Sequence, residues 1–230
     1  MNTLCIDTSS VTCACAVFKD GKMIADILLN NGLNHSKTLL PSIKKVLEES
    51  GISAKEIENI SVTVGPGSFT GVKIAAATVK GLAFERNIPC TAVSTLEALA
   101  YNRQSDGLVC AVMDARRGML YNGIFRIEKG KAIRLTEDRQ ISCDELFAEI
   151  NGKDIFITGD GTELFKNFCN ERGFNPQVAE GDFKFVRGEG VYKAAENCGF
   201  IITESEKLVP EYLRLPQAER ERLEKEKGGK

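Results

Sequence analysis

Two aspartates stand at the ends of short apolar runs, where each could help to hold a phosphate group and its magnesium ion. Asp7 precedes the small polar residues 8–10, and Asp114 ends the run 108–113. A carboxylate, hydroxyl groups and backbone amides at a tight strand turn are suitable ligands for a metal-bound phosphate. The same residues also satisfy the backbone of an ordinary hairpin corner. Both interpretations stay open on this pattern alone.

A glycine-rich turn, GPGSFTG at residues 65–71, lies between an apolar run and a segment with helical periodicity. Glycine lets a backbone approach a ligand closely, and a helix N-terminus favours an anion. Because the turn lacks the lysine of a GxxxxGK[ST] loop, we prefer the alternative that it packs a helix onto a sheet. Residues 159–161 repeat the pattern. The turns supply ten candidate residues for a degenerate nucleotide cleft: Asp7, Thr8, Ser9, Gly65, Gly67, Ser68, Asp114, Arg116, Gly159 and Gly161.

Catalytic side chains are few. His35 is the single histidine of the chain, so a pair of histidines on one helical face cannot hold a metal ion. The sequence contains no GxSxG motif, and a Ser-His-Asp arrangement would need His35, which precedes a helical segment and suits capping or packing better. We therefore expect no catalytic residue, no metal site and no cofactor.

The composition is that of an ordinary folded protein, with 230 residues, 43% hydrophobic and 27% charged. A net charge of -2 argues against a dedicated nucleic-acid binder, so any RNA contact should be indirect. The sequence has no basic leader before its first apolar run and no membrane-length apolar stretch, which predicts a cytoplasmic protein without a membrane partner. The eight cysteines are scattered through apolar runs and are expected to be reduced and buried.

The positions of these residues require an alternating strand and helix pattern. Three strand-like runs cover residues 3–30, and Asp20-Gly21 marks a hairpin between the last two. A helix begins near His35 and ends at Gly51, with Pro41 expected to bend it near its start. The remaining elements of this half are predicted as strand 60–64, helix 72–86, strand 90–93 and helix 95–102.

A similar order of predicted strands and helices begins again after the polar stretch 103–107. Strands are predicted at 108–113, 120–127, 132–135 and 155–158, and the last of these enters a glycine turn and a helix. The sequence therefore predicts an α/β protein with two ribonuclease H-like lobes around a cleft. We place the lobes at residues 1–103 and 104–216, followed by a charged tail at 217–230 without an assigned function.

Helix 72–86 is apolar or small almost all round, so one face can cover the sheet while a second face remains. We prefer a helix-helix dimer interface, shared with the preceding helix, for that second face. A helix buried inside the chain's own core is the alternative. The same face could form a homodimer when the chain is alone. The candidate interface residues are Leu39, Ile43, Val72, Ala76, Ala77, Val79, Lys80 and Ala83.

Several of these segments resemble, in order and spacing, the TsaB (YeaZ) family of threonylcarbamoyladenosine biosynthesis proteins, in the actin-like ATPase (ASKHA) superfamily. The resemblance covers nearly the whole chain, and it implies a second lobe that is reduced relative to the first. It rests on IDTSS at 6–10, HS..LLP at 35–41, VGPGSFTGVKI at 64–74, VKGLA at 79–83, STLEALA at 94–100, DARRGMLY at 114–121 and PEYLRLPQAE at 210–219.

The resemblance implies a non-catalytic subunit that works through a complex. The family's catalytic paralogue, TsaD, transfers threonylcarbamoyl to adenosine in tRNAs reading codons that begin with A, and a small ATPase, TsaE, joins the pair. The paralogue carries two metal-binding histidines in an HxxxH helix, and the corresponding positions here resemble Thr95 and Leu99. Neither side chain replaces an imidazole on a metal. The resemblance also implies that the first-lobe helices contact the paralogue.

An alternative is an independent kinase or nucleotide-binding enzyme of the actin-like fold. Such an enzyme needs a working carboxylate and two phosphate-binding turns, and it should bind nucleotide with magnesium. The second turn departs from that pattern, since Arg116 and Arg117 stand where small residues are expected. These arginines could contact a nucleotide, an acidic partner or tRNA. A peptidase would lack a nucleophile-base pair.

Overall fold

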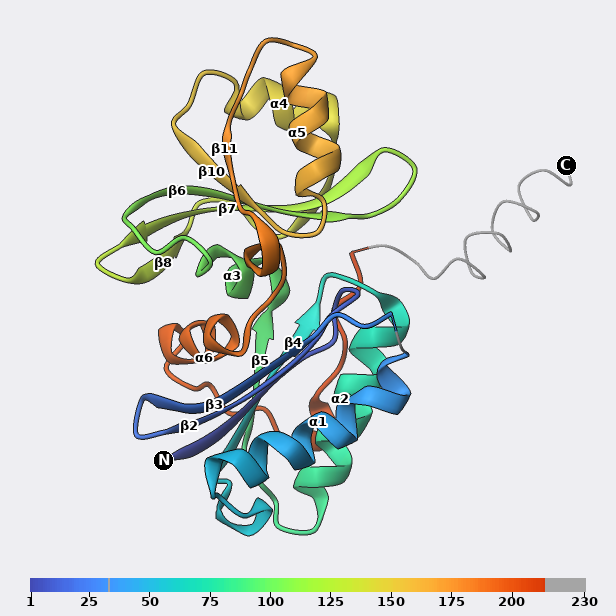
Figure 1. Ribbon diagram of the computed structural model, residues 1–230, viewed down its shortest axis with the longest axis vertical. Helices are drawn as coiled ribbons and strands as arrows, with labels where there is room; N and C mark the ends of the chain where they lie inside the picture. The colour runs from blue at the N-terminus through green and yellow to red at the C-terminus, as the bar shows by residue number, and fades with distance from the viewer. Residues whose placement is uncertain (33, 214–230) are drawn as a thin grey trace, which may run out of the picture.

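The computed structural model describes residues 1–32 and 34–213, which form two sheet-centred lobes (Figure 1). The predicted charged tail at 217–230 lies outside these residues. None of the described helices is both long and apolar enough to cross a membrane. The division at residues 103 and 104 remains a prediction.

The first lobe is built on a five-stranded sheet in the order β3-β2-β1-β4-β5. The first three strands are antiparallel neighbours, while β4 and β5 continue the sheet parallel to β1. The predicted hairpin at Asp20-Gly21 is confirmed, because both residues have the positive φ that a tight two-residue turn requires. The strands are β1 (Asn2–Asp7), β2 (Cys13–Lys19), β3 (Lys22–Leu29), β4 (Asn59–Gly65) and β5 (Cys90–Ser94).

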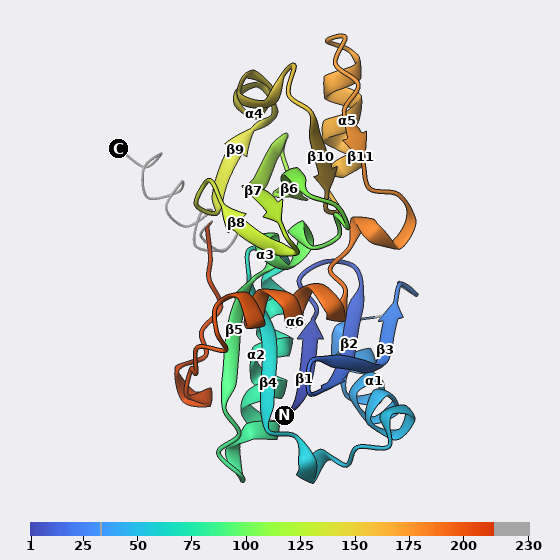
Figure 2. The ribbon, with the colours of Figure 1, turned by 90° about the vertical axis from the view of Figure 1, so that its left-hand side faces the viewer.

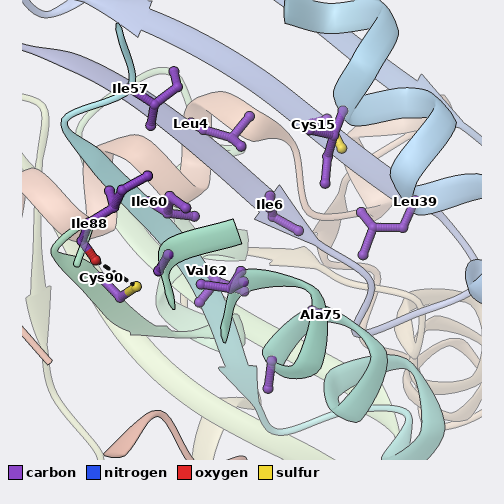
Figure 3. Close-up of a cluster of buried hydrophobic side chains, with 14 of the residues drawn as sticks. Leu4, Ile6, Cys15, Leu39, Ile57, Ile60, Val62, Ala75, Ile88 and Cys90 are labelled. Carbon is purple, nitrogen blue, oxygen red and sulfur yellow. Dashed lines mark hydrogen bonds between the residues drawn. The ribbon is translucent and has the colours of Figure 1, made fainter. Parts of the chain in front are cut away.

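Helices α1 (His35–Ser50) and α2 (Phe69–Phe84) lie side by side on one face of this sheet (Figure 1). Gly51 ends α1 in the left-handed conformation, and the Ser68 hydroxyl accepts a hydrogen bond from the Gly71 amide at the start of α2. The core between helices and sheet includes Leu39 and Ala75, as Figure 3 shows. The predicted helices are therefore confirmed, and α2 begins three residues earlier than predicted.

The second sheet repeats the strand order of the first, as β11-β10-β6-β7-β8. Strand β9 (Arg139–Ser142) additionally pairs with β7. Helices α4 (Cys143–Ile150) and α5 (Thr162–Asn170) form the core of this lobe with the sheet. The other strands are β6 (Gly107–Asp114), β7 (Met119–Glu128), β8 (Lys131–Arg134), β10 (Ile155–Thr158) and β11 (Gln177–Val178).

The chain then returns to the first sheet. Helix α6 (Gly188–Asn197) packs with α3 (Thr95–Ala100) on the face opposite α1 and α2 (Figure 2). After α6, Thr203 pairs with Cys90 at the sheet edge, and a short 3-10 helix, η3 (Ser205–Lys207), lies against α2. The sequence reading assigned no element to α4, β9 or α6, and it did not anticipate this return.

Candidate functional site

A cavity of about 340 Å³ lies between the two lobes, at the carboxyl ends of β1 and β6. Five of the ten predicted cleft residues line it: Ser9, Gly67, Ser68, Asp114 and Arg116. The other five are buried in the turns behind this lining: Asp7, Thr8, Gly65, Gly159 and Gly161. The cavity therefore brings together the two turns that the sequence placed far apart.

The first-lobe turn, at residues 7–10 after β1, is held by a fully buried carboxylate. Asp7 Oδ1 accepts hydrogen bonds from the Thr63 hydroxyl at 2.5 Å and from the Ser9 amide at 3.2 Å. Asp7 Oδ2 has no hydrogen-bond partner within residues 1–32 and 34–213. Burial raises the pKa of Asp7, while the bonds from Ser9 and Thr63 oppose that rise. Asp7 thus ties the end of β1 to β4.

The glycine turn at 65–71 packs directly onto the first-lobe turn. A Cβ atom at Gly67 would overlap the carbonyl oxygen of Ser9, and one at Gly71 would overlap that of Thr8. The Ser68 amide also donates to the Ser9 carbonyl at 2.7 Å. Since these glycines let backbone approach backbone, their contacts support the preferred packing interpretation of the turn. Binding of a nucleotide by these residues remains a hypothesis.

The second-lobe turn is more open and is built around two carboxylates. Asp114 Oδ1 accepts a hydrogen bond from the Arg116 amide at 2.7 Å, and its Oδ2 lies 3.2 Å from the Arg116 guanidinium. Asp160 Oδ1 accepts from the Asp114 amide at 3.1 Å. Burial, together with the nearby Asp114 carboxylate, raises the pKa of Asp160 to about 6. Asp160 lines the cavity, but the sequence reading named only its glycine neighbours.

His35 supports the first-lobe turn from α1. Its Nε2 lies 2.8 Å from the Ser10 carbonyl oxygen. Because that oxygen only accepts, Nε2 carries a proton and donates it. Nδ1 is buried and has no hydrogen-bond partner in the described chain. This arrangement supports a packing role for the single histidine.

Thr95 and Leu99, which the resemblance places at the HxxxH positions, are the first and the last but one residue of α3. Thr95 and Leu99 are both buried, and the Thr95 hydroxyl is without a hydrogen-bond partner among the residues described. Within residues 1–32 and 34–213, no group of three or more histidine, cysteine, aspartate or glutamate side chains could hold a metal ion.

The predicted interface residues need a correction. Six of the eight are 0–5% exposed: Leu39, Ile43, Val72, Ala76, Val79 and Ala83. All of them except Val72 belong to the core between these helices and the sheet. Their side chains are buried in the isolated chain, so the interface predicted for them is not supported by exposed surface and stays a prediction. Ala77 is exposed and Lys80 is half-buried, so these two remain candidates.

The outward face of the same helices is nevertheless apolar in part. Leu40 on α1 is 57% exposed, and Phe84 at the end of α2 is 73% exposed. Ala77 and Gly81 are exposed between the two ends of α2, and a Cβ at Gly81 would meet nothing within 4 Å. We call Leu40, Ala77, Gly81 and Phe84 the outer helix face. The sequence predicted a second apolar face on this helix, but it assigned mainly buried residues to that face because α2 is small and apolar on both sides.

Two lobes with the same strand order around a cleft define the actin-like ATPase fold, with a reduced second lobe. Component A of the (R)-2-hydroxyglutaryl-CoA dehydratase of Acidaminococcus fermentans shares it, with a TM-score of 0.50 at 13% identity over 86% of this chain and 99% of that chain. YeaZ from Pseudomonas aeruginosa is more similar, with a TM-score of 0.77 and 27% identity over 92% and 99% of the two chains.

Sequence comparisons narrow this class to one family. Residues 30–218 match the family model "TsaD: tRNA N6-adenosine threonylcarbamoyltransferase". The TsaB protein of Bacillus subtilis (strain 168) is 32% identical, over 99% of this chain and 100% of its own. TsaB of Escherichia coli (strain K12) is 30% identical over 75% and 77% of the two chains. The chain belongs to the TsaB family of tRNA threonylcarbamoyladenosine biosynthesis proteins.

Proposed function

We propose that this chain is a non-catalytic subunit required for threonylcarbamoyladenosine formation on tRNAs reading codons that begin with A. It scaffolds and activates a metal-bearing transferase of the TsaD type, together with a TsaE-type ATPase. Family membership supports the pathway. The observation that carries the scaffold role is the outer helix face, where Leu40 and Phe84 are more than half exposed on two adjacent helices.

A pair of such helices suits docking against another helix pair. Ala77 and Gly81 lie one turn apart on α2, and small residues allow close approach of a second backbone. Lys73 and Lys80 flank Ala77 and would form part of a polar rim. In the absence of the transferase, the same face can pair with a second copy of the chain.

The proposal also holds that this chain has no catalytic or metal-binding side chains of its own. Its one histidine holds a turn, and the positions equivalent to the paralogue's metal ligands are a threonine and a leucine inside the core. With a net charge of -2, the chain is a poor match for the tRNA phosphates, so the proposal assigns tRNA binding to the partner. Because the reaction uses tRNA, the proposed location is the cytoplasm.

The interface can be tested with a matched pair of substitutions. Ala77→Glu places a carboxylate on the exposed side of α2, where Lys73 and Lys80 can pair with it in the free chain. Ala148→Glu makes the same change at an exposed alanine of α4 in the other lobe. Calorimetric titration with a TsaD-type transferase should show affinity lowered at least about thirtyfold by Ala77→Glu and unchanged by Ala148→Glu.

The role itself can be tested by reconstitution. A mixture of transferase, ATPase, the threonylcarbamoyl donor and tRNA should produce modified tRNA with the wild-type chain and much less with Ala77→Glu. Equal modification without this chain would refute the proposed requirement. If binding were unaffected by Ala77→Glu while the requirement remained, the interface would lie elsewhere.

The independent nucleotide-binding enzyme remains the second candidate, favoured by the three aspartates near the cavity. It predicts magnesium-dependent nucleotide binding and turnover by the chain alone. Asp7→Ala should abolish such binding, but Asp7 is buried and its loss could unfold the turn. Asp114→Asn is the milder second variant, because Asp114 lies at the cavity wall.

A further inference from the structure

The last described residues form a strap along the first lobe. Thr203 donates its amide proton to the Cys90 carbonyl at 2.7 Å, and Lys80 Nζ donates to the Glu206 carbonyl at 3.1 Å. Leu208 is fully buried in the core beneath α2. These contacts fix residues 203–208 to the sheet edge and to α2.

After Leu208 the strap leaves the core, and its last residues reach the cavity between the lobes. Glu211, Tyr212 and Leu213 all line that cavity. The Glu211 amide donates to the Val64 carbonyl at 2.7 Å. Gly65 has a φ of +125°, and a Cβ atom there would overlap the Glu211 carbonyl oxygen. The first glycine of the glycine turn is therefore in close contact with the chain's own strap.

An aromatic pair completes the contact. The Tyr212 ring lies 4.8 Å from the Phe69 ring, at an interplanar angle of 37°, and Lys73 Nζ is 3.9 Å from the centre of the Phe69 ring. The side chains of this part are poorly covered, since Val209 is 67% and Tyr212 is 41% exposed. Few buried apolar contacts and exposed backbone bonds characterise segments that open locally without global unfolding.

We propose that residues 209–213 form a releasable lid on the interlobe cavity, hinged at the anchor residue Leu208. In the docked state the lid covers the glycine turn through Glu211 and Tyr212. In the released state Val64 and Gly65 are uncovered and the cavity loses one wall. This inference rests on the contacts of the strap and does not depend on the proposed function.

Native-state amide hydrogen exchange on the full chain tests the lid directly. After correction for intrinsic rates, the Glu211 amide should exchange at least about tenfold faster than the Thr203 amide, although both donate at 2.7 Å. Phe69→Ala should speed Glu211 exchange a further two- to twelvefold, the equivalent of an aromatic pair worth about 0.5–1.5 kcal/mol. The Thr203 rate should not change.

Phe84→Ala is the matched control, because Phe84 lies at the opposite end of α2 from Phe69. It should leave Glu211 exchange unchanged. Tyr212→Ala should act like Phe69→Ala, and the double variant should add nothing further if the two rings act on each other. Exchange of Glu211 as slow as that of Thr203, or insensitivity to both ring truncations, would overturn the lid.

Discussion

The two lobes share one strand order, yet they differ in the helices that cover it. In both sheets the central strand, β1 or β6, begins an antiparallel meander of three strands, and two strands parallel to the central strand extend the sheet on its other side. In the first lobe α1 and α2 have 16 residues each, whereas α4 and α5 have 8 and 9. The two lobes therefore share a sheet topology but differ in the length of the helices that cover it.

The surfaces of the paired helices show what this freedom allows. On α4, the exposed residues Asp144, Glu145 and Glu149 surround Ala148. On α2, the exposed positions include Ala77, Gly81 and Phe84. An acidic face stays in water, whereas a longer face of small and apolar residues can bury against another protein. The difference explains why the proposed interface involves the first lobe.

The two aspartate turns also differ, since the first is more buried than the second. Asp7 is fully buried and held by Thr63 and Ser9, while Asp114 keeps 28% of its side chain exposed and pairs with a surface arginine. The first turn is a structural element of its lobe, and the second forms an open wall of the cavity. Substitutions at equivalent positions of the two turns can therefore distinguish residues that stabilise the core from residues that lie at the surface.

The largest effect should come from the buried leucines under the helices. Leu39→Ala in α1 and Leu146→Ala in α4 each remove a side chain that is at most 1% exposed, at a cost of about 2–5 kcal/mol. Urea unfolding of the isolated chain measures it. Leu40→Ala, at a 57% exposed neighbour, should change stability by about 0.5 kcal/mol or less. A Leu39→Ala protein as stable as the wild type would contradict the core role of Leu39.

The equivalent glycines Gly65 and Gly159 should respond unequally. Both have strongly positive φ, +125° and +118°, but Gly159 faces the Val112 carbonyl of β6 whereas Gly65 faces Glu211 of the lid. Strain and overlap together should make Gly159→Ala cost at least about 3 kcal/mol. Gly65→Ala should cost about 1–3 kcal/mol, because release of the lid relieves the overlap.

Urea midpoints of the two alanine variants decide this prediction. Gly130→Ala is the control for positive φ alone, since its φ is +76° and a Cβ there meets nothing within 4 Å. Equal losses at Gly65 and Gly159 would indicate that the lid is as fixed as a sheet strand.

Asp160 should make stability depend on pH. Its pKa is raised in the folded protein from an ordinary 3.8 to about 6. The folded state thus binds the proton more tightly, so the stabilisation is fully present below pH 3.8 and is lost as the pH rises through about 6. Asp160→Asn should stabilise the chain by about 1–2 kcal/mol at pH 7 and have little effect near pH 4.

Urea titrations of wild type and Asp160→Asn between pH 4 and pH 7.5 measure that difference. Asparagine keeps an oxygen to accept the bond from the Asp114 amide. A stability difference that is constant across this range would show that Asp160 titrates normally.

The sequence predicted the sheets and the turns well because their signals are local. Strand-length apolar runs, Asp20-Gly21 and the glycine turn at 65–71 each specify backbone geometry within a few residues. The cavity followed from that prediction, because Ser9, Gly67 and Asp114 stand at strand ends that the repeated topology brings together.

Other features depend on tertiary contacts that no local pattern contains. Ala76 and Ala77 are identical neighbours, yet one is buried and one exposed, because the sheet lies on only one side of α2. The strap at 203–213 has only one turn of 3-10 helix and otherwise irregular backbone, so its return to the first sheet left no periodic signal. The raised pKa of Asp160 likewise depends on burial and on the Asp114 carboxylate at the end of the neighbouring strand β6.

The smallest expected effect lies at the open turn. Arg116→Ala removes an ion pair with Asp114 whose guanidinium is 81% exposed, but it keeps the backbone amide that donates to Asp114 Oδ1. Exposed pairs gain little because water and salt screen them, so the loss of stability should be about 0.5 kcal/mol or less and should vanish in 1 M salt.

Thr63→Ala, which removes the buried partner of Asp7, should cost about 1.5–3 kcal/mol. Urea unfolding at low and high salt measures both. A loss above about 1 kcal/mol for Arg116→Ala would mean that the second turn is as firmly held as the first, and the contrast between a structural and an open turn would fail.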